Sequence, residues 1–131
     1  MKEPSFLTLA EVLEIHRVQI KHYGGDPAIR DLGLLESAVA MPQSSFGGNL
    51  LHPSLLIMAA AYAYHIAENQ PFVDGNKRTA LASALIFLEI NGVEIDDPKG
   101  CLYEAMMGVA MRKLSKDGLS SLFGELSKKR K

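Results

Sequence analysis

The sequence has no tryptophan and a single cysteine, Cys101, among its 131 residues. One cysteine excludes an internal disulfide and suits a reducing compartment, so we expect a cytoplasmic protein. No charge-free apolar run reaches the ~20 residues that a membrane-spanning helix needs, and the first residues do not begin a signal peptide. The sequence therefore predicts neither a membrane protein nor a secreted one.

An excess of charge of either sign is also lacking, because 14 Lys and Arg residues oppose 15 Asp and Glu residues, for a net charge of -1. This balance gives no general reason to expect nucleic acid or an anionic membrane as a partner. The basic run 128–131 is expected to be a disordered, solvated tail. At 47% hydrophobic, the chain has the composition of a globular protein, and its length predicts one domain over residues 1–131.

Strand-like alternation and internal repeats are absent, and the hydrophobic period is helical almost throughout. The pattern predicts an all-α domain, with Thr8 and Glu11 as a capping box for the first helix and Asp31 as the cap of the second. Six helices are expected, at about 9–22, 32–41, 53–69, 76–91, 98–113 and 117–126. The segment 43–51 is predicted to be an exposed loop, and 93–95 is too short to start a sheet.

Two of these helices are unusually poor in charge. Residues 53–67 and 79–88 contain no Asp, Glu, Lys or Arg, and helices that are apolar on every face belong at the centre of a bundle. The loop between them, 68–78, is by contrast rich in charged and amide side chains, which are costly to desolvate without partners. Free backbone N–H groups of the following helix point into the same region. We interpret the loop as a phosphate-binding site; the alternative is a well-capped polar turn.

The residues of this loop have separate expected roles. Phe72 should anchor the loop in the core, and Asp74 is a hard oxygen ligand suited to Mg²⁺. Gly75 allows close approach of the backbone to a phosphate. Arg78 can bind phosphate oxygens through two N–H groups, and Lys77 adds a point charge. Neither the P-loop pattern nor a G-x-G-x-x-G motif is present.

The segment 71–80, Pro-Phe-Val-Asp-Gly-Asn-Lys-Arg-Thr-Ala, resembles the signature of the Fic/Doc (Fido) family, and within it the death-on-curing branch. The resemblance extends over about 7–126, through segments 22–25, 29–31, 34–38 and 88–93. It implies a compact six-helix bundle whose two central helices are joined by the motif loop. It also implies an enzyme that moves part of a nucleoside triphosphate onto a hydroxyl of a target protein. Death-on-curing toxins of this family act as kinases on the translation elongation factor Tu.

The resemblance assigns roles residue by residue. ATP and Mg²⁺ are the implied cofactors, with Asp74 as metal ligand. Gly75 and Asn76 correspond to the anion hole, Arg78 to the residue that holds the outer phosphates, and 43–51 to the flap that aligns the target segment. Members that transfer AMP usually have Gly where this chain has Lys77 and a second Arg where it has Leu81. These differences favour phosphoryl transfer, for which Asp74, Asn76, Lys77 and Arg78 supply positioning and charge.

A further departure concerns the proton acceptor. The family motif begins with a histidine that takes the proton from the target hydroxyl, and this chain has Gln70 there. Loss of a general base typically lowers the rate about 10²–10⁴-fold. Three interpretations remain open: a weak enzyme that relies on charge stabilisation, a nucleotide binder without transfer, or a catalytic Gln70 that orients the nucleophile by hydrogen bonding.

None of the four histidines is an obvious replacement. His65 lies five residues before Gln70, some 140° away around the helix, and is expected to be a hydrogen-bonded core residue. With Glu68 it has the i, i+3 spacing of a metal pair, which is weak without further ligands. His16, His22 and His52 are expected to be capping or surface residues.

Three hypotheses follow: a transferase toxin of a type II toxin–antitoxin system, an impaired member that binds nucleotide or antitoxin, and a helical interaction module with a structural loop. Many Fido proteins carry an inhibitory motif of Ser or Thr, three residues, Glu, then Gly or Asn, which is absent from this sequence. We therefore expect restraint by an antitoxin of the prevents-host-death type, docked at the loop and at 43–51. Direct contact with nucleic acid or a membrane is not expected.

Overall fold

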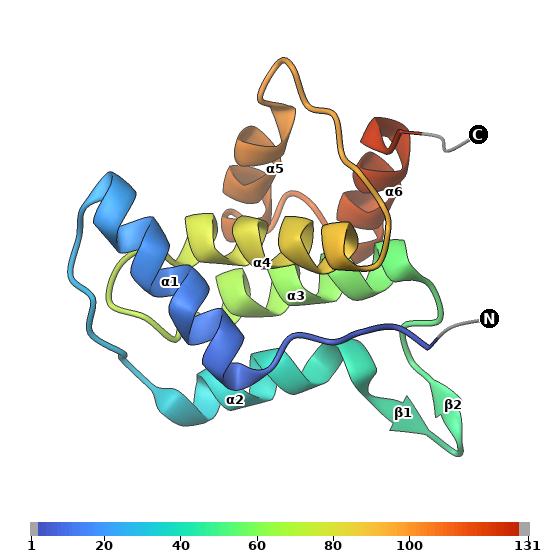
Figure 1. Ribbon diagram of the computed structural model, residues 1–131, viewed down its shortest axis with the longest axis horizontal. Helices are drawn as coiled ribbons and strands as arrows, with labels where there is room; N and C mark the ends of the chain where they lie inside the picture. Colours follow the sequence, from blue (N-terminus) through green and yellow to red (C-terminus); the bar gives the residue numbers. More distant parts are fainter. Residues whose placement is uncertain (1–2, 129–131) are drawn as a thin grey trace.

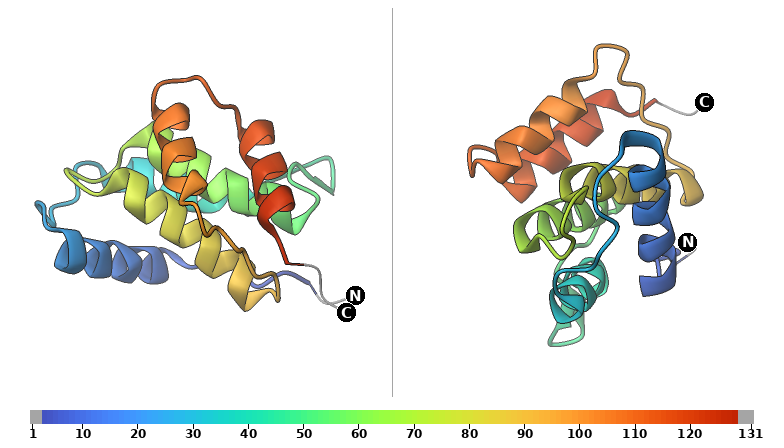
Figure 2. Two further views of the ribbon diagram at one scale, coloured as in Figure 1. Left: turned by 90° about the horizontal axis from the view of Figure 1, so that it is seen from above. Right: turned by 90° about the vertical axis from the view of Figure 1, so that its left-hand side faces the viewer.

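Helices α3 (Leu55–Asn69) and α4 (Asn76–Ile90) lie side by side through the middle of the molecule (Figure 1). The computed structural model describes residues 3–128. Helix α1 packs against α4 and α2 against α3 on one side, whereas α5 and α6 cover the other side (Figure 2). The remaining bounds are α1 (Leu9–Tyr23), α2 (Leu32–Ala40), the 3₁₀ helix η1 (Met41–Gln43), α5 (Cys101–Ala110) and α6 (Lys116–Leu126). The predicted all-α architecture with six α-helices is confirmed within this part of the chain.

Alanine explains the close approach of the central helices. Helix α3 buries five alanines and α4 buries two, so the two backbones can pack with few large side chains between them. Aromatic rings fill the remaining space, and the rings of Tyr62 and Phe87 have centroids 5.1 Å apart. No helix among residues 3–128 is long and apolar enough to cross a membrane.

Helix boundaries follow local capping where the sequence shows it. The capping box of Thr8 and Glu11 and the Asp31 cap are present as predicted. Helix α5 is shorter than the expected 98–113. It begins after Gly100 because the Asp97 carboxylate accepts hydrogen bonds from the N–H groups of Cys101 and Leu102, at 2.8 and 2.9 Å.

The other end of α5 and the start of α3 also differ slightly from expectation. Helix α5 ends early because the Gly108 carbonyl accepts from the N–H groups of Lys113 and Leu114, and Arg112 takes a left-handed φ of 59°. Helix α3 begins two residues after Pro53, with Ser54 as its cap. These corrections leave the order of the helices unchanged.

Most described side chains of the segment 43–51 are exposed, as predicted, but the expected loop contains a small antiparallel hairpin. Strand β1 (Ser45–Phe46) pairs with β2 (Asn49–Leu50) across a turn of two glycines with positive φ. The hairpin lies near the start of α3, whereas the α3–α4 loop lies at its other end (Figures 1 and 2). The structure therefore separates the expected flap from the motif loop.

The C-terminal segment pairs with the chain that follows α4. Ile95 forms an isolated bridge with Ser127, and the N–H of Lys128 donates to the carbonyl of Glu94 at 2.9 Å. The prediction of a disordered tail at 128–131 is thus corrected for Lys128, and residues 129–131 lie outside the described part.

A cluster of three basic side chains connects α6 with α3 and with the segment between β2 and α3. The Lys116 Nζ lies 2.9 Å from the Nε2 atoms of both His52 and His65. His52, expected to be a capping or surface residue, is buried, so the surface position is wrong. His65 is hydrogen-bonded, as predicted. Burial, followed by the charge of Lys116, lowers the pKa of His65 to about 4.

This cluster predicts a loss of stability in acid. The folded chain disfavours protonated His65, so its contribution is complete above the unfolded pKa of about 6.5 and is lost as the pH falls toward 4. Because the ring is partly exposed to water, we expect His65 to contribute about 1–2 kcal/mol to the difference between pH 7.5 and 4.5.

Urea unfolding of the wild type, His65→Gln and the control His22→Gln at both pH values measures this contribution. His65→Gln should lose less stability on acidification than the wild type, and His22→Gln should behave as the wild type, since His22 is exposed. Equal losses in all three proteins would contradict the prediction.

Candidate functional site

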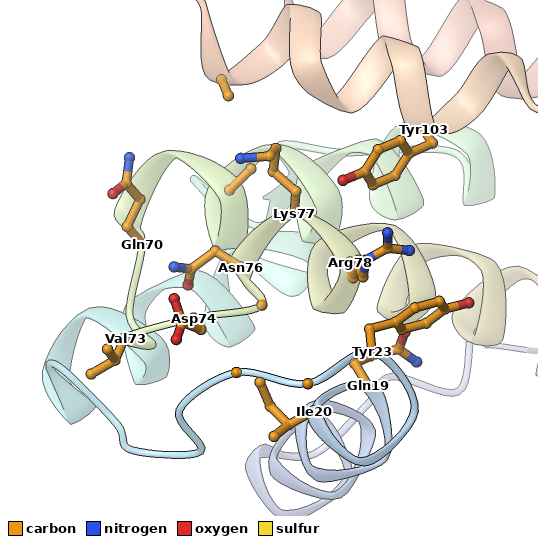
Figure 3. A pocket seen from close by; sticks show the side chains of 15 residues that line it. Gln19, Ile20, Tyr23, Gln70, Val73, Asp74, Asn76, Lys77, Arg78 and Tyr103 are labelled. Carbon is orange, nitrogen blue, oxygen red and sulfur yellow. The ribbon is translucent and has the colours of Figure 1, made fainter.

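A cavity of about 580 Å³ opens where the α3–α4 loop meets the end of α1 and one face of α5 (Figure 3). Every residue that the sequence proposed for the site lines it: Gln70, Asp74, Gly75, Asn76, Lys77 and Arg78. The chain between α1 and α2 and the helices α1 and α5 supply the other walls, through Gln19, Ile20, Tyr23, Gly24, Gly25 and Tyr103, among others. No described residue of 43–51 lines the cavity, so the expected flap is not part of this site.

The side chain of Asn76 closes the motif loop on itself. Its Oδ1 accepts from the N–H of Phe72 at 3.0 Å, and its Nδ2 donates to the Phe72 carbonyl at 2.9 Å. Phe72 is buried, as predicted, and anchors the loop in the core. Because the Asn76 amide is engaged at both ends, the backbone N–H groups at the start of α4 remain as the anion donors at this position.

Gly75 provides the space for such an anion. It precedes α4 with φ 82°, and no side chain caps the helix at this residue. A Cβ at Gly75 would lie 3.2 Å from Ile20 Cδ1, so a larger residue would meet both strain and steric contact. The helix N-terminus thus faces the cavity with its positive dipole end open.

His16, on α1, contacts the motif loop and holds it in place, a role that the sequence did not indicate. The residue was expected to be a capping or surface residue, but only 3% of it is exposed. Its ring stacks parallel on Phe72 with centroids 3.6 Å apart, and its Nε2 donates to the carbonyl of Asp74 at 2.9 Å. Its spacing on α1 could have indicated an inward position, but the partner 58 residues away could not be inferred.

The segment 24–31, between α1 and α2, also holds the motif loop through hydrogen bonds. The Pro71 carbonyl accepts from the N–H groups of Arg30 and Asp31, and the N–H of Val73 donates to Ala28. The Arg30 guanidinium donates to the carbonyls of Gln70 and Asn69, at 2.6 and 2.8 Å. A cation at the C-terminal end of α3 satisfies carbonyls that the helix leaves free.

Asp74 has one carboxylate oxygen fixed and one available. Its Oδ2 accepts from the N–H of Asp26 at 2.8 Å. Among residues 3–128 there is no group of three or more His, Cys, Asp or Glu side chains that could hold a metal alone. Mg²⁺ is often bound by one or two carboxylates together with substrate phosphates and waters. Asp74 therefore fits a Mg²⁺ ion that is bound together with a nucleotide.

Arg78 lies between two aromatic rings. Its guanidinium carbon is 3.8 Å from the centroid of Tyr23, on α1, and 4.7 Å from that of Tyr103, on α5. Such cation–π contacts fix the plane of the guanidinium and leave the N–H groups at its edge for a ligand. The sequence identified Arg78 but neither tyrosine, because aromatic residues on separate helices carry no spacing signal.

The position of the missing base is exposed to solvent and carries Gln70. This residue ends α3 in the left-handed conformation, with φ 46°, and its side chain lines the cavity (Figure 3). No histidine of the described chain lines this cavity. His65 belongs to the separate cluster with Lys116, and Glu68 instead pairs with Arg112 at 3.4 Å, so the structure brings together neither a replacement base nor the His65–Glu68 metal pair.

Residues 6–88 match the sequence profile of the Fic/DOC family. The chain belongs to this family. It is 34% identical over 119 residues to the "Protein kinase doc" of Escherichia phage P1, an alignment that covers 87% of this chain and 92% of that protein. It is 49% identical over 73 residues to the "Toxin Doc" of Mycolicibacterium smegmatis, over 56% of each chain. The second match thus spans little more than half the length of that relative.

Membership confirms the resemblance that the motif loop indicated and makes the chain a Doc-like member. The profile match contains the whole loop from Gln70 to Arg78, as well as His16 and the bracing Arg30. It ends within α4, so Tyr103 on α5 lies beyond it. The alignment with the phage protein covers 87% of this chain and therefore includes α5 and Tyr103 as well.

The role of His16 is testable with His16→Phe. Phenylalanine retains the stack on Phe72 but cannot donate to the Asp74 carbonyl. We expect a loss of about 1–2 kcal/mol in the free energy of unfolding and several-fold weaker ATP–Mg²⁺ binding, measured by urea unfolding and calorimetry. The control His22→Phe, exposed on the same helix, should change neither quantity. Unchanged stability and affinity in His16→Phe would show that the hydrogen bond does not position the loop.

Proposed function

We propose that the protein is a Doc-like toxin that transfers a phosphoryl group from ATP to a hydroxyl of a target protein. The observation that carries the proposal is the convergence of Asp74, Lys77 and Arg78 with the open N-terminus of α4 in one cavity. The name of the phage relative, a protein kinase, supports the same reaction class. Elongation factor Tu is the target that the resemblance implies.

Phosphoryl transfer asks a protein mainly for positioning and charge stabilisation. Backbone N–H groups of the first turn of α4 would hold phosphate oxygens, and Arg78 would bind them through its free edge. Lys77 adds positive charge at the same wall. Asp74 would hold Mg²⁺, which neutralises phosphate charge when bound. Leu81 stands where AMP-transferring members have a second Arg, which favours phosphoryl transfer over AMP transfer.

Gln70 leaves a second function open: an impaired member that binds nucleotide or antitoxin without efficient transfer. Its amide cannot act as a base near neutral pH, but it can hydrogen-bond to a hydroxyl and orient it. Its exposed position at the cavity edge favours the enzyme, since an orienting group must reach the incoming target.

An antitoxin of the prevents-host-death type is the proposed protein partner in the cytoplasm. The edge of the cavity carries exposed apolar side chains, with Tyr23 62%, Val73 47% and Tyr103 38% exposed. Apolar side chains around a polar cavity suit a partner that covers it. The hairpin at 43–51 lies at the other end of α3 from this edge (Figures 1 and 2), so the proposed docking surface is centred on the cavity edge alone.

Nucleotide binding is tested with Arg78→Ala. ATP–Mg²⁺ should bind the wild type, and the variant should bind about 1.5–3 kcal/mol more weakly if a charge-assisted hydrogen bond is lost. Isothermal calorimetry measures both affinities, with Arg112→Ala as the control, since that arginine is largely exposed and pairs only with Glu68 among the described residues. No binding of ATP to the wild type at millimolar concentration would refute the site.

The transfer reaction is tested with Gln70→His, which restores the histidine that serves as the general base in the family. We expect labelling of a target protein from radioactive ATP to rise about 10²-fold or more, provided that chemistry limits the rate. Gln19→His is the matched control, because it places an imidazole in the same cavity on α1. Equal rates in wild type and Gln70→His would indicate that Gln70 already serves the nucleophile. No labelling by either protein, with ATP binding retained, would favour the impaired member.

A further inference from the structure

The cluster of Lys116, His52 and His65 forms a second polar centre that the proposed reaction does not use. It lies in a separate cavity of about 400 Å³, and none of its residues lines the ATP cavity. The lining is Leu51, His52, Ile57, Tyr64, His65, Ser115, Lys116 and Asp117. Lys116 is half-buried and so remains accessible, whereas His52 is buried.

The hydrogen bonds fix the protonation of the cluster. A lysine ammonium only donates, so the Nε2 atoms of His52 and His65, each 2.9 Å from Nζ, must both accept. Both imidazoles are therefore neutral, with their proton on Nδ1. Burial lowers the pKa of Lys116, against the opposing charge of Asp117. Burial and the Lys116 charge also lower the pKa of both histidines.

We propose that Lys116 is a nucleophilic lysine that accepts a small acyl group from an acyl phosphate, with His52 or His65 receiving the proton of the attacking nitrogen. An adjacent base activates a weak nucleophile by this arrangement. The ammonium first releases one proton to water, and the neutral Nζ then attacks the acyl carbon, so that a C–N bond forms. The C–O bond to phosphate breaks, and phosphate leaves with the bonding electron pair. The nitrogen loses its proton to an imidazole Nε2, which passes it to water.

The surroundings favour a small donor with a phosphate leaving group. The cavity is large enough for an acetyl or similar group and is partly apolar, with the Tyr64 ring 5.9 Å from Nζ. Ser115 caps α6, an 11-residue helix, and Lys116 is its first residue. The leaving phosphate would thus depart at the positive end of this helix.

Acylation would also change the contacts of the cluster. An acyl-lysine has one N–H donor in place of the three of the ammonium, so it can bond to only one of the two imidazoles. The link from α6 to either α3 or the segment before it would be lost. The modification would therefore loosen the side of the bundle next to the hairpin while leaving the ATP cavity intact.

The full chain, incubated with acetyl phosphate at neutral pH, tests the proposal. Site-resolved mass spectrometry should show acetylation of Lys116 about tenfold faster than that of Lys113. Lys113 is a suitable internal control because it is exposed and only three residues away. A rate at Lys116 equal to or below that at Lys113 would overturn the proposal.

Two further measurements test whether Lys116 reacts fast because the histidines take its proton or only because its amine is accessible. His52→Gln and His65→Gln keep a hydrogen-bond acceptor but cannot take a proton. Each variant should therefore lower the acetylation rate of Lys116 several-fold and leave the acetylation rate of Lys113 unchanged. In the wild type, the ratio of the two rates should fall as the pH is lowered from 5.5 toward 3.5, a range that spans the His65 pKa of about 4, because protonated imidazoles no longer accept. A ratio that is constant over this range, or variants that are folded by circular dichroism and react as the wild type, would overturn the role of the histidines.

Discussion

The closed loop between the charge-free stretches 53–67 and 79–88 is the constraint on which the site depends. Helices α3 and α4 are buried together, so the polar chain that joins them must find partners at the edge of the core. The Asn76 amide supplies two of these partners to the backbone of Phe72, and the Phe72 ring fixes the loop to the core. Asp74, Lys77 and Arg78 then leave the loop in directions that converge on one cavity.

Much of this could be predicted from the sequence, because the signals are local. The cap at Asp31, the charge-free runs and the composition of 68–78 each specify structure within a few residues of themselves. Together with the helical periodicity of the rest of the chain, these signals indicated six helices and most of the proposed site residues, whereas Gln70 was proposed from the family resemblance. The errors at α5 were also local in origin, since Asp97 caps from a position outside the helix and Pro98 was read as its start.

What the sequence could not supply are partners distant along the chain. His16 contacts Asp74 across 58 positions and Arg30 contacts Gln70 across 40. Tyr23 and Tyr103 both contact Arg78 only because α1 and α5 both pack against α4. Helical periodicity tells which face of a helix is apolar, but it does not tell which helix lies against that face. The hairpin shows the same limit. The family resemblance assigned 43–51 a role in the site, but α2 packs against α3 so that the hairpin lies near the start of α3, at the opposite end from the motif loop.

The two cationic centres differ in how their charges are held, and this difference separates their chemistry. The guanidinium of Arg78 is held by aromatic faces, which occupy its plane and leave its donors free, so it is suited to bind an anion. The Nζ of Lys116 is held by two nitrogen lone pairs, which occupy its donors and can receive its proton, so it is suited to react. Arginine stays charged at any working pH, whereas a half-buried lysine is displaced toward its neutral form. The arginine therefore suits anion binding at the N-terminal end of α4, whereas Lys116, at the start of α6, suits the proposed nucleophilic attack once it has lost its positive charge.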